Sequence, residues 1–410
     1  MSSRDQVTEM NEKVVNNPLL PLLGLGAEEN EARGLRYTPH EIYQQPETWR
    51  STYERCVRKA PELNRFLERS GVGRRDHLEP VVFLVGAGTS DYVGRALTHL
   101  FRARWQCEAW AIPSTDLLTN MESLITPGKK YLWIAFSRSG DSPEGVAVLT
   151  KALDTHPQIR HLVITCNETG RMAQICSAQA ERTLALLLDP AVNDRGLAMT
   201  SSFTNLVIAG QCLAHLDDLP GYGDLLGGMS EVGARFLQSA PKCAAEIAAM
   251  GCTRACFVGS GALAAVANES ALKLLELTAG RVETLSESVL GLRHGPMSAV
   301  DENTLFVAFL SSNEKRRCYE IDLLKEVREK RLGKVTVVVT PQPYQGLDAL
   351  ADFVLPLDVP MALADEYRPP VDVILAQLLG LFHSLNAGLQ PDRPSPNGVI
   401  SRVVSHVNIY

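Results

Sequence analysis

The chain contains the same strand, glycine turn and helix pattern at two places. Residues 81–85 read Val-Val-Phe-Leu-Val and lead into Gly86-Ala-Gly88, and residues 254–258 read Arg-Ala-Cys-Phe-Val and lead into Gly259-Ser-Gly261. A helix is expected after each turn. Apolar strands that alternate with helices are typical of parallel sheets that helices cover on both faces. The chain is therefore expected to be an α/β protein with two similar halves, each built on a doubly wound parallel sheet.

The other expected elements follow the same alternation. In the first half we expect helices near 47–70, over 91–104, after Pro113 and over 143–153, and strands over 108–112, 131–136 and 161–165. In the second half we expect a helix over 262–279 and strands over 304–310, 335–339 and 353–357. A helical stretch over 204–250, broken by the glycines of 221–228, is expected to join the halves, and 391–398 is expected to be irregular. The domains predicted are an N-terminal extension (1–45), a first domain (46–220), a second domain with its leading helix (221–390) and a C-terminal tail (391–410).

Composition and charge exclude some classes of partner. The 410 residues are 45% hydrophobic and 21% charged, which is ordinary for a soluble globular protein. A nucleic acid or an anionic membrane would favour a basic face, whereas the formal net charge is −7. The apolar stretch 19–26 is too short for a signal peptide or a membrane span, and Pro21 and Gly24 interrupt it. We therefore expect neither a nucleic acid nor a membrane as a partner.

The nine cysteines do not have the spacing of a metal site. No CxxC pair occurs, and Cys252 and Cys256 lack a histidine-rich partner segment. Cys166 and Cys212 lie in apolar runs, as Cys256 does, and are expected to be buried. Scattered free thiols suit a reducing cytoplasm. We expect a cytoplasmic protein with no bound metal.

A serine-rich loop follows the strand expected over 131–136 and reads Ser137-Arg138-Ser139-Gly140-Asp141-Ser142. Backbone N–H groups at the start of the following helix attract anions, and the hydroxyls and Arg138 add further donors. Gly140 permits a turn that a bulkier residue resists. Phosphate binding is one interpretation, and simple helix capping by Ser142 or Asp141 is the other. The loop is not a Walker A motif, and neither glycine turn continues into a dinucleotide fingerprint, so no nucleotide cofactor is expected.

A second group of polar residues lies on the helix expected over 262–279. Glu269, Lys273 and Glu276 are spaced i, i+4 and i+7, so they share one face. A surface ion pair is one interpretation. The apolar residues around them favour burial, and buried charges usually have a function. Both interpretations stay open at this point.

His294 precedes Gly295-Pro296 in a segment with little periodicity. Histidine is the side chain best suited to proton transfer near neutral pH. A lone histidine in a loop is, however, more often structural or solvent-exposed. The residue alone leaves catalysis as one of these alternatives.

Taken together, these segments resemble a known family. Gly86-Ala-Gly-Thr-Ser90, the serine loop, Glu269-x3-Lys273-x2-Glu276 and Arg293-His-Gly-Pro296 are similar in order and spacing to tandem sugar isomerase (SIS) domains, including the isomerase half of glucosamine-6-phosphate synthase. Three segments look like the AgaS branch, namely 194–202, 286–296 and 391–404. The resemblance covers about residues 35 to 410. It implies two flavodoxin-like, three-layer α/β/α SIS domains.

The resemblance also implies roles for individual residues. The phosphate of a phosphorylated amino sugar or ketose would be held by four serines, Ser90, Ser137, Ser139 and Ser142. Glu276 would move a proton between C1 and C2, and His294 would assist ring opening. In the synthase relatives this histidine reaches the site from the neighbouring subunit, which implies a homodimer that shares His294 across its interface. Other positions implied to face the substrate are Glu269, Lys273, Asp194, Leu197 and Ala198.

Two departures from the synthase pattern bear on the reaction. This chain has no glutaminase domain with an N-terminal cysteine, so glutamine is not expected to supply ammonia. The C-terminal active-site lysine is also missing, and Arg402, the nearest basic residue in the tail, is expected to contact the substrate. Arginine is a poor Schiff-base former because it keeps its charge.

The AgaS-type motifs without a glutaminase favour one reaction. We expect the chain to convert galactosamine 6-phosphate to tagatose 6-phosphate and ammonia by aldose–ketose proton transfer, with no cofactor. One alternative is isomerisation of tagatose 6-phosphate without deamination. A second is a regulator that binds a phosphosugar without turning it over.

Overall fold

A computed structural model describes residues 17–73, 79–359, 363–404 and 407–410 of the chain. These residues form two compact units. Unit 1 holds the described residues up to Pro46, together with Arg195–Thr200 and Gly228–Ile400. Unit 2 holds Glu47–Asp194, Ser201–Gly227 and Ser401–Tyr410. Neither unit is continuous in sequence, and the domain boundaries expected at 45, 220 and 390 stay a prediction.

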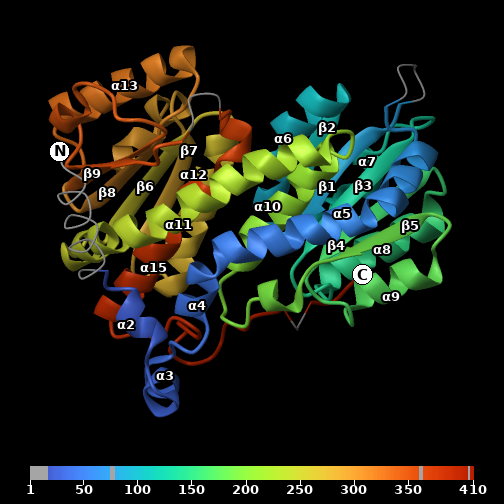
Figure 1. Cartoon of the computed structure of the whole chain (residues 1–410), viewed down its shortest axis with the longest axis horizontal. Helices are drawn as coiled ribbons and strands as arrows, with labels where there is room; N and C mark the ends of the chain where they lie inside the picture. The colour runs from blue at the N-terminus through green and yellow to red at the C-terminus, as the bar shows by residue number, and fades with distance from the viewer. Residues whose placement is uncertain (1–16, 74–78, 360–362, 405–406) are drawn as a thin grey trace. The chain divides into compact units, whose positions relative to one another are not determined.

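Unit 2 is built on a five-stranded parallel sheet in the order β2-β1-β3-β4-β5. Its strands are β1 (Val81–Gly86), β2 (Ala109–Pro113), β3 (Tyr131–Ser137), β4 (Ile159–Thr165) and β5 (Thr183–Leu187). Its helices are α5 (from Gln45 in unit 1 to Ser70), α6 (Thr89–Trp105), α7 (Ser114–Leu124), α8 (Pro143–Thr155), α9 (Arg171–Ala178) and α10 (Ser201–Ala214). Helix α6 packs against α10, whereas α7, α8 and α9 pack in chain order, and helices lie on both sides of the sheet (Figure 1).

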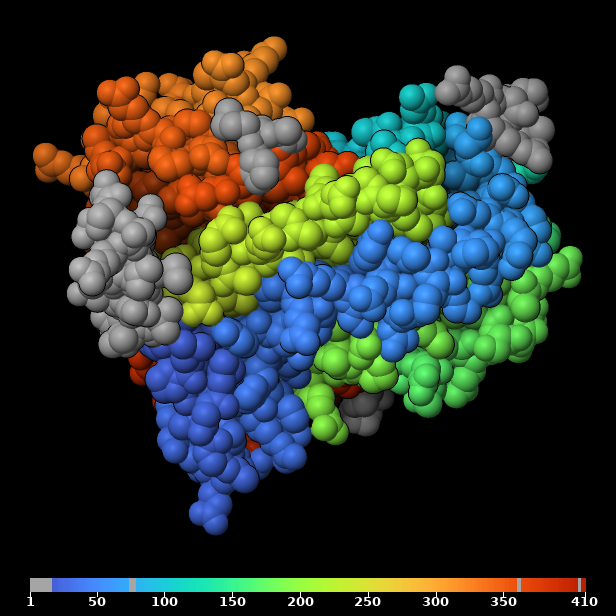
Figure 2. All heavy atoms as spheres, in the orientation of Figure 1, coloured from blue at the N-terminus to red at the C-terminus, as the bar shows by residue number. Residues whose placement is uncertain are grey.

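Unit 1 repeats this architecture with the strand order β10-β9-β8-β6-β7. Its strands are β6 (Arg254–Gly259), β7 (Glu283–Ser288), β8 (Thr304–Phe309), β9 (Val335–Thr340) and β10 (Phe353–Pro356), all paired in parallel. Its helices are α2 (Leu20–Leu23), α3 (Ala27–Arg33), α4 (Thr38–Tyr43), α12 (Ala262–Leu277), α13 (Glu314–Glu329), α14 (Pro369–Asp372) and α15 (Ile374–Asn386). Charge-rich α13 lies on the surface of unit 1, in orange in Figure 2.

Short 3-10 helices lie at Pro190–Val192, Gly291–Arg293, Pro296–Ala299, Leu347–Ala349 and Asp365–Tyr367. Helix α11 (Leu219–Ala249) begins in unit 2 and ends in unit 1. Among the described residues, none of the helices is both long and apolar enough to cross a membrane.

The two glycine turns have matching backbone geometry, as expected for two similar halves. Gly88 has φ 56° and ψ −127°, and Gly261 has φ 60° and ψ −126°. This positive-φ region favours glycine. A Cβ on Gly86 would lie 2.2 Å from the backbone carbon of Ser90, and a Cβ on Gly259 would lie 2.2 Å from the carbonyl oxygen of Leu263. Each turn therefore needs glycine for the close approach of strand and helix.

The expected break in the joining helix is wrong. Helix α11 continues through 221–228, and the interruption instead falls between Ala214 and Leu219. Gly223 leaves room for Tyr53, since a Cβ at this position would lie 2.5 Å from the Tyr53 hydroxyl.

Strands β5 and β7 and helix α9 were not expected. Strand β7 lies at a sheet edge. Its sequence does not alternate between apolar and polar residues, since Glu, Thr and Ser make up most of it.

The expected fold class is confirmed by the two sheets. Taken from the first strand of each unit, the strand order is 2-1-3-4-5 in both, which is a doubly wound order. The predicted burial of Cys166, Cys212 and Cys256 is also confirmed.

Ligands bind doubly wound sheets at the carboxyl ends of the strands, at the switch point where the strand order changes direction. In unit 2 this point lies between β1 and β3.

Candidate active site

The serine loop leaves β3 at this switch point of unit 2. Ser137 Oγ accepts a hydrogen bond from Gly140 N–H at 2.9 Å, and Ser139 Oγ accepts one from Asp141 N–H at 3.2 Å. Both hydroxyls keep their own proton for donation to a ligand. Gly140 has φ 65°, so the glycine that the sequence predicted for this turn is required. The loop thus offers hydroxyl donors at the start of α8.

Helix capping does not explain the loop. Ser142 stands at the N-cap position of α8, but its side chain makes no capping hydrogen bond. Asp141 turns to the next helix instead, where its Oδ1 accepts from Arg171 N–H at 2.8 Å. Asn167 donates to Asp141 Oδ2 at 3.3 Å and to Ser139 O at 2.8 Å. The carboxylate is therefore occupied at the start of α9, and the expectation that Ser142 or Asp141 caps α8 is wrong.

Ser90 lies on the other side of the same switch point, in the first turn of α6. Its side chain is buried, and the Gly86 turn brings its backbone against β1. The neighbouring Asp91 is paired with Arg95 at 2.8 Å, and burial raises the pKa of the Asp91 carboxyl although Arg95 opposes the rise. The structure thus places Ser90 and the serine loop after adjacent strands of one sheet.

Arg138 and Arg402 connect the loop to the C-terminal tail within unit 2. Arg138 is buried, and its Nη2 donates to Arg402 O at 2.6 Å. Arg402 Nε donates to Asp194 O at 2.6 Å, and Arg402 Nη2 donates to Asn193 Oδ1. Both arginines therefore hold protein groups, and their predicted contacts with substrate stay a prediction.

Asp194 also has a structural partner. Its carboxylate accepts from Ser202 N–H at 2.7 Å and from the hydroxyls of Ser201 and Ser202, each at 2.5 Å, at the start of α10. In unit 1, Leu197 N–H donates to Asp392 O at 3.0 Å, and Ala198 is buried. The substrate contacts implied for Asp194, Leu197 and Ala198 stay predictions.

Glu269, Lys273 and Glu276 lie on one face of α12 in unit 1, as the spacing predicted. The side chains of Glu269 and Lys273 are 0% exposed, whereas that of Glu276 is 30% exposed. Lys273 Nζ lies 2.5 Å from Glu276 Oε2 and 3.4 Å from Glu269 Oε1. The interpretation as a surface ion pair is therefore wrong. The buried ammonium of Lys273 pairs with the buried carboxylate of Glu269 and with the partly exposed carboxylate of Glu276.

His294 is exposed at the end of the 3-10 turn Gly291–Arg293 that follows β7. Arg293 fixes this turn to α13 through Glu326 at 2.6 Å and Asp322 at 3.1 Å, and Leu292 is buried. Ion pairs therefore attach the turn to α13, while the side chain of His294 is exposed. The sharing of His294 across a dimer interface stays a prediction.

Two residues that sequence reasoning missed support these loops. Asn167 fixes the serine loop as described above. In unit 1, Asp392 accepts from Thr38 N–H at 2.8 Å and from its hydroxyl at 2.7 Å, and burial raises the pKa of the Asp392 carboxyl. Asp392 lies in the Pro391-Asp-Arg-Pro motif of the tail, which was the available signal.

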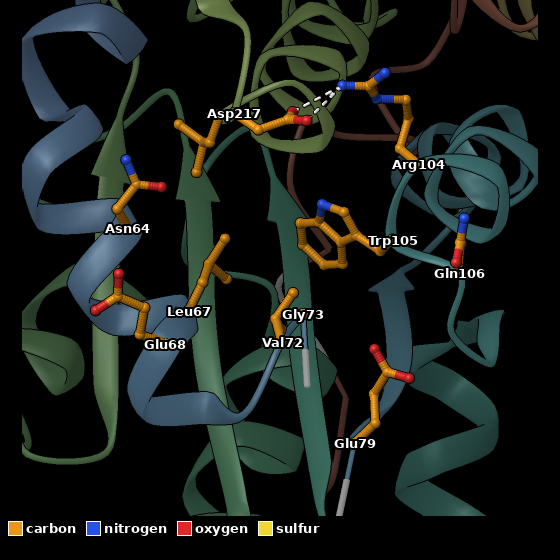
Figure 3. A pocket seen from close by; sticks show the side chains of 11 residues that line it. Asn64, Leu67, Glu68, Val72, Gly73, Glu79, Arg104, Trp105, Gln106 and Asp217 are labelled. Atoms are coloured by element: carbon orange, nitrogen blue, oxygen red, sulfur yellow. Dashed lines mark hydrogen bonds and ion pairs between the residues drawn. The ribbon is translucent and has the colours of Figure 1, made fainter. Parts of the chain in front are cut away.

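A hollow of about 630 Å³ lies elsewhere in unit 2 (Figure 3). Arg104 and Asp217 form an ion pair of 2.7 Å at its edge, and Trp105 points into it. Glu79, which precedes β1, is also part of its lining. The hollow therefore lies toward the amino end of β1, away from the carboxyl ends where the serine loop begins. None of the predicted site residues lines it.

Comparison with known proteins agrees with this fold and these motifs. The SIS domain family matches residues 250–381. D-galactosamine-6-phosphate deaminase AgaS of Escherichia coli is 34% identical over 390 residues, which cover 91% of this chain and 95% of that protein. The chain belongs to the AgaS family. The predicted resemblance is therefore confirmed.

Solved structures extend the comparison beyond sequence. The crystal structure of tagatose-6-phosphate ketose/aldose isomerase from Escherichia coli has a TM-score of 0.81 and 31% identity, and the match covers 91% of this chain and 96% of that one. The C-terminal domain of glucosamine-fructose-6-phosphate aminotransferase from Francisella tularensis has a TM-score of 0.70 at 19% identity, covering 86% and 96%, and it shows the shared fold alone. The AgaS relatives are named as enzymes, so the regulator alternative is not favoured.

Proposed function

We propose that this AgaS-family chain converts galactosamine 6-phosphate and water to tagatose 6-phosphate and ammonia. The observation that carries the proposal is the buried Lys273 that holds the half-exposed carboxylate of Glu276, in a chain 34% identical to a named galactosamine-6-phosphate deaminase. A carboxylate held in this way is suited to transfer a proton between adjacent carbons. The proposal assigns phosphate binding to Ser90 and the serine loop.

The chemistry proceeds through one proton shift and one hydrolysis. After ring opening, Glu276 removes the proton from C2 of the aldehyde form and returns it to C1, while one proton passes from the amine nitrogen to O1. The C2 amine becomes an imine while C1 becomes an alcohol. Water then adds to the C2 imine, and ammonia leaves as the ketone forms. The net reaction consumes one water, so the deamination is also a hydrolysis.

We infer that the chain works as a homodimer in which His294 acts on the substrate bound to the other copy. The exposed position of His294 on an anchored loop supports this proposal. We also infer a cytoplasmic location, since all nine cysteines are free.

The experiment is a comparison of hexosamine 6-phosphates as substrates. Purified protein should release ammonia from galactosamine 6-phosphate faster than from its gluco and manno epimers. No ammonia from any of the three would reject the proposal.

A second candidate reaction is isomerisation of tagatose 6-phosphate without deamination. The 31% identity to a structure named tagatose-6-phosphate ketose/aldose isomerase favours it. An assay with tagatose 6-phosphate and no amine separates the two, because only the isomerase forms an aldose there.

A further inference from the structure

The loop after β8 in unit 1 occupies the place that the serine loop occupies in unit 2. Val85 of β1 pairs with Ala135 of β3, and Val258 of β6 pairs with Ala308 of β8 in the same register. Both loops begin two residues beyond these alanines, at the strand-order switch of their sheet. In unit 1 this second loop is residues 310–313, Leu-Ser-Ser-Asn, and it precedes α13.

The second loop holds a carboxylate of the chain itself. Asp365 is 2% exposed, and its Oδ1 accepts from Ser312 N–H at 2.7 Å. Its Oδ2 accepts from the Ser311 hydroxyl. A backbone N–H and a serine hydroxyl thus converge on one buried anion.

Two guanidinium groups complete the surroundings of this carboxylate. Arg368 Nη1 lies 3.2 Å from Asp365 Oδ1, and Arg316 Nη1 lies 3.1 Å from Asp365 Oδ2. Arg368 is 0% exposed and is also bound to Asp372 at 2.7 Å, so it is fixed in place. Hydroxyl, backbone N–H and arginine donors together are the ligand set of a phosphate site.

We propose that the second loop is an anion site for a phosphate monoester that Asp365 occupies as an internal ligand. Removal of the Asp365 carboxylate exposes the donors of Ser311, Ser312 and Arg316 to an external anion. The side chain of Arg316 is 42% exposed, so the site opens to solvent on that side. In the native chain the serine loop of unit 2 is then the one of the two equivalent loops that takes a phosphosugar.

The test counts inorganic phosphate bound per chain by calorimetry in Asp365→Ala and in the native protein. The variant should bind one more phosphate per chain than the native protein. The additional phosphate would bind in unit 1 alone. It is therefore expected even if the serine loop of unit 2 binds no phosphate and the proposed function fails. Two controls each remove one negative charge near Arg316 without opening the loop. Asp365→Asn keeps the side-chain volume, and Glu366→Ala removes the carboxylate 3.9 Å from Arg316.

The outcomes decide the proposal in each case. An added site in Asp365→Ala but in neither control supports it. No added site, or an equal gain in a control, overturns it. If Asp365→Ala does not fold in chloride, refolding of it and of Asp365→Gly is compared in phosphate and in chloride at equal ionic strength. Recovery in phosphate alone supports the internal ligand, and failure in both salts overturns it.

Discussion

Lys273 is the residue on which the proposed role of Glu276 depends most. Its ammonium is buried and pairs with the buried carboxylate of Glu269 and the partly exposed carboxylate of Glu276. Burying an unpaired charge is costly, whereas a buried charge with partners is tolerated. The arrangement therefore orients Glu276 while leaving its carboxylate accessible.

Substitution of Glu276→Gln should remove turnover and keep substrate binding. Glutamine has nearly the same shape but cannot accept the C2 proton, so we expect turnover to fall by about 10²–10⁴-fold. Measurements of kcat and of phosphosugar affinity by calorimetry check this. Native-like kcat would exclude Glu276 as the base.

Substitution of Lys273→Met should destabilise the protein by about 3–5 kcal/mol, because the buried Glu269 loses its charge partner. Urea unfolding measures the loss. The matched control is the double variant Glu269→Gln with Lys273→Met, which removes both charges and should recover most of the stability. Equal stability of the single and double variants would show that burial of the charge is not the cause.

At the scale of elements, the strand–turn–helix joints place the polar loops. Gly86 allows α6 to begin against β1, since a Cβ there would lie 2.2 Å from Ser90 C. The backbone atom cannot move away as a flexible side chain would. The position of Ser90 thus depends on the absence of a side chain at Gly86.

Gly86→Ala should destabilise the protein by about 1–3 kcal/mol through overpacking, and it should weaken phosphosugar binding as Ser90 shifts. The control is Gly227→Ala in α11, where a Cβ has no neighbour within 4 Å. There alanine should stabilise the helix by up to about 1 kcal/mol. Unfolding and binding are measured for both variants. Unchanged affinity in Gly86→Ala would contradict the role of the joint.

Local patterns predicted much of this structure, and long-range contacts account for the rest. The two glycine turns, the serine loop and the spacing of Glu269, Lys273 and Glu276 follow from neighbouring residues, so they could be identified in the sequence. The bond from Arg138 to Arg402 joins residues 264 positions apart, and no local pattern indicates it. Strand β7 was missed because an edge strand lacks the continuous apolar run of a central one.

At the scale of the whole molecule, buried acids in unit 1 make stability depend on pH. Burial raises the pKa of Glu320 from 4.5 to about 6 and that of Asp372 from 3.8 to about 6. A raised pKa means that the folded state holds more protons than the unfolded state between these values. Stability should therefore fall as the pH rises from about 4 to about 6.

Glu320→Gln isolates one of these groups. The native protein should lose about 2 kcal/mol more than the variant between about pH 3.5 and pH 7, because glutamine does not titrate. Asp372 contributes equally to the pH dependence of both proteins, so its contribution cancels in the comparison. Denaturant unfolding at several pH values measures the difference. Parallel pH profiles would show that Glu320 titrates normally in the folded state.

Mixing of two inactive variants tests the proposed sharing of His294. In a hybrid dimer of Glu276→Gln and His294→Ala, one of the two sites would have both native residues. After equal mixing and refolding, about a quarter of the native activity should return, since half the dimers are hybrids. No recovery would place His294 with the Glu276 of its own chain, and full activity of His294→Ala alone would place His294 outside the reaction.

Following the proton from C2 to C1 tests the proposed deamination most directly. Galactosamine 6-phosphate carrying deuterium at C2 is incubated with the protein, and ammonia, tagatose 6-phosphate and the label at C1 are measured together. The proposed mechanism gives ammonia and tagatose 6-phosphate in equal amounts, with part of the deuterium transferred to C1 and none transferred by Glu276→Gln. Tagatose 6-phosphate without ammonia, or deuterium that stays at C2, would contradict it.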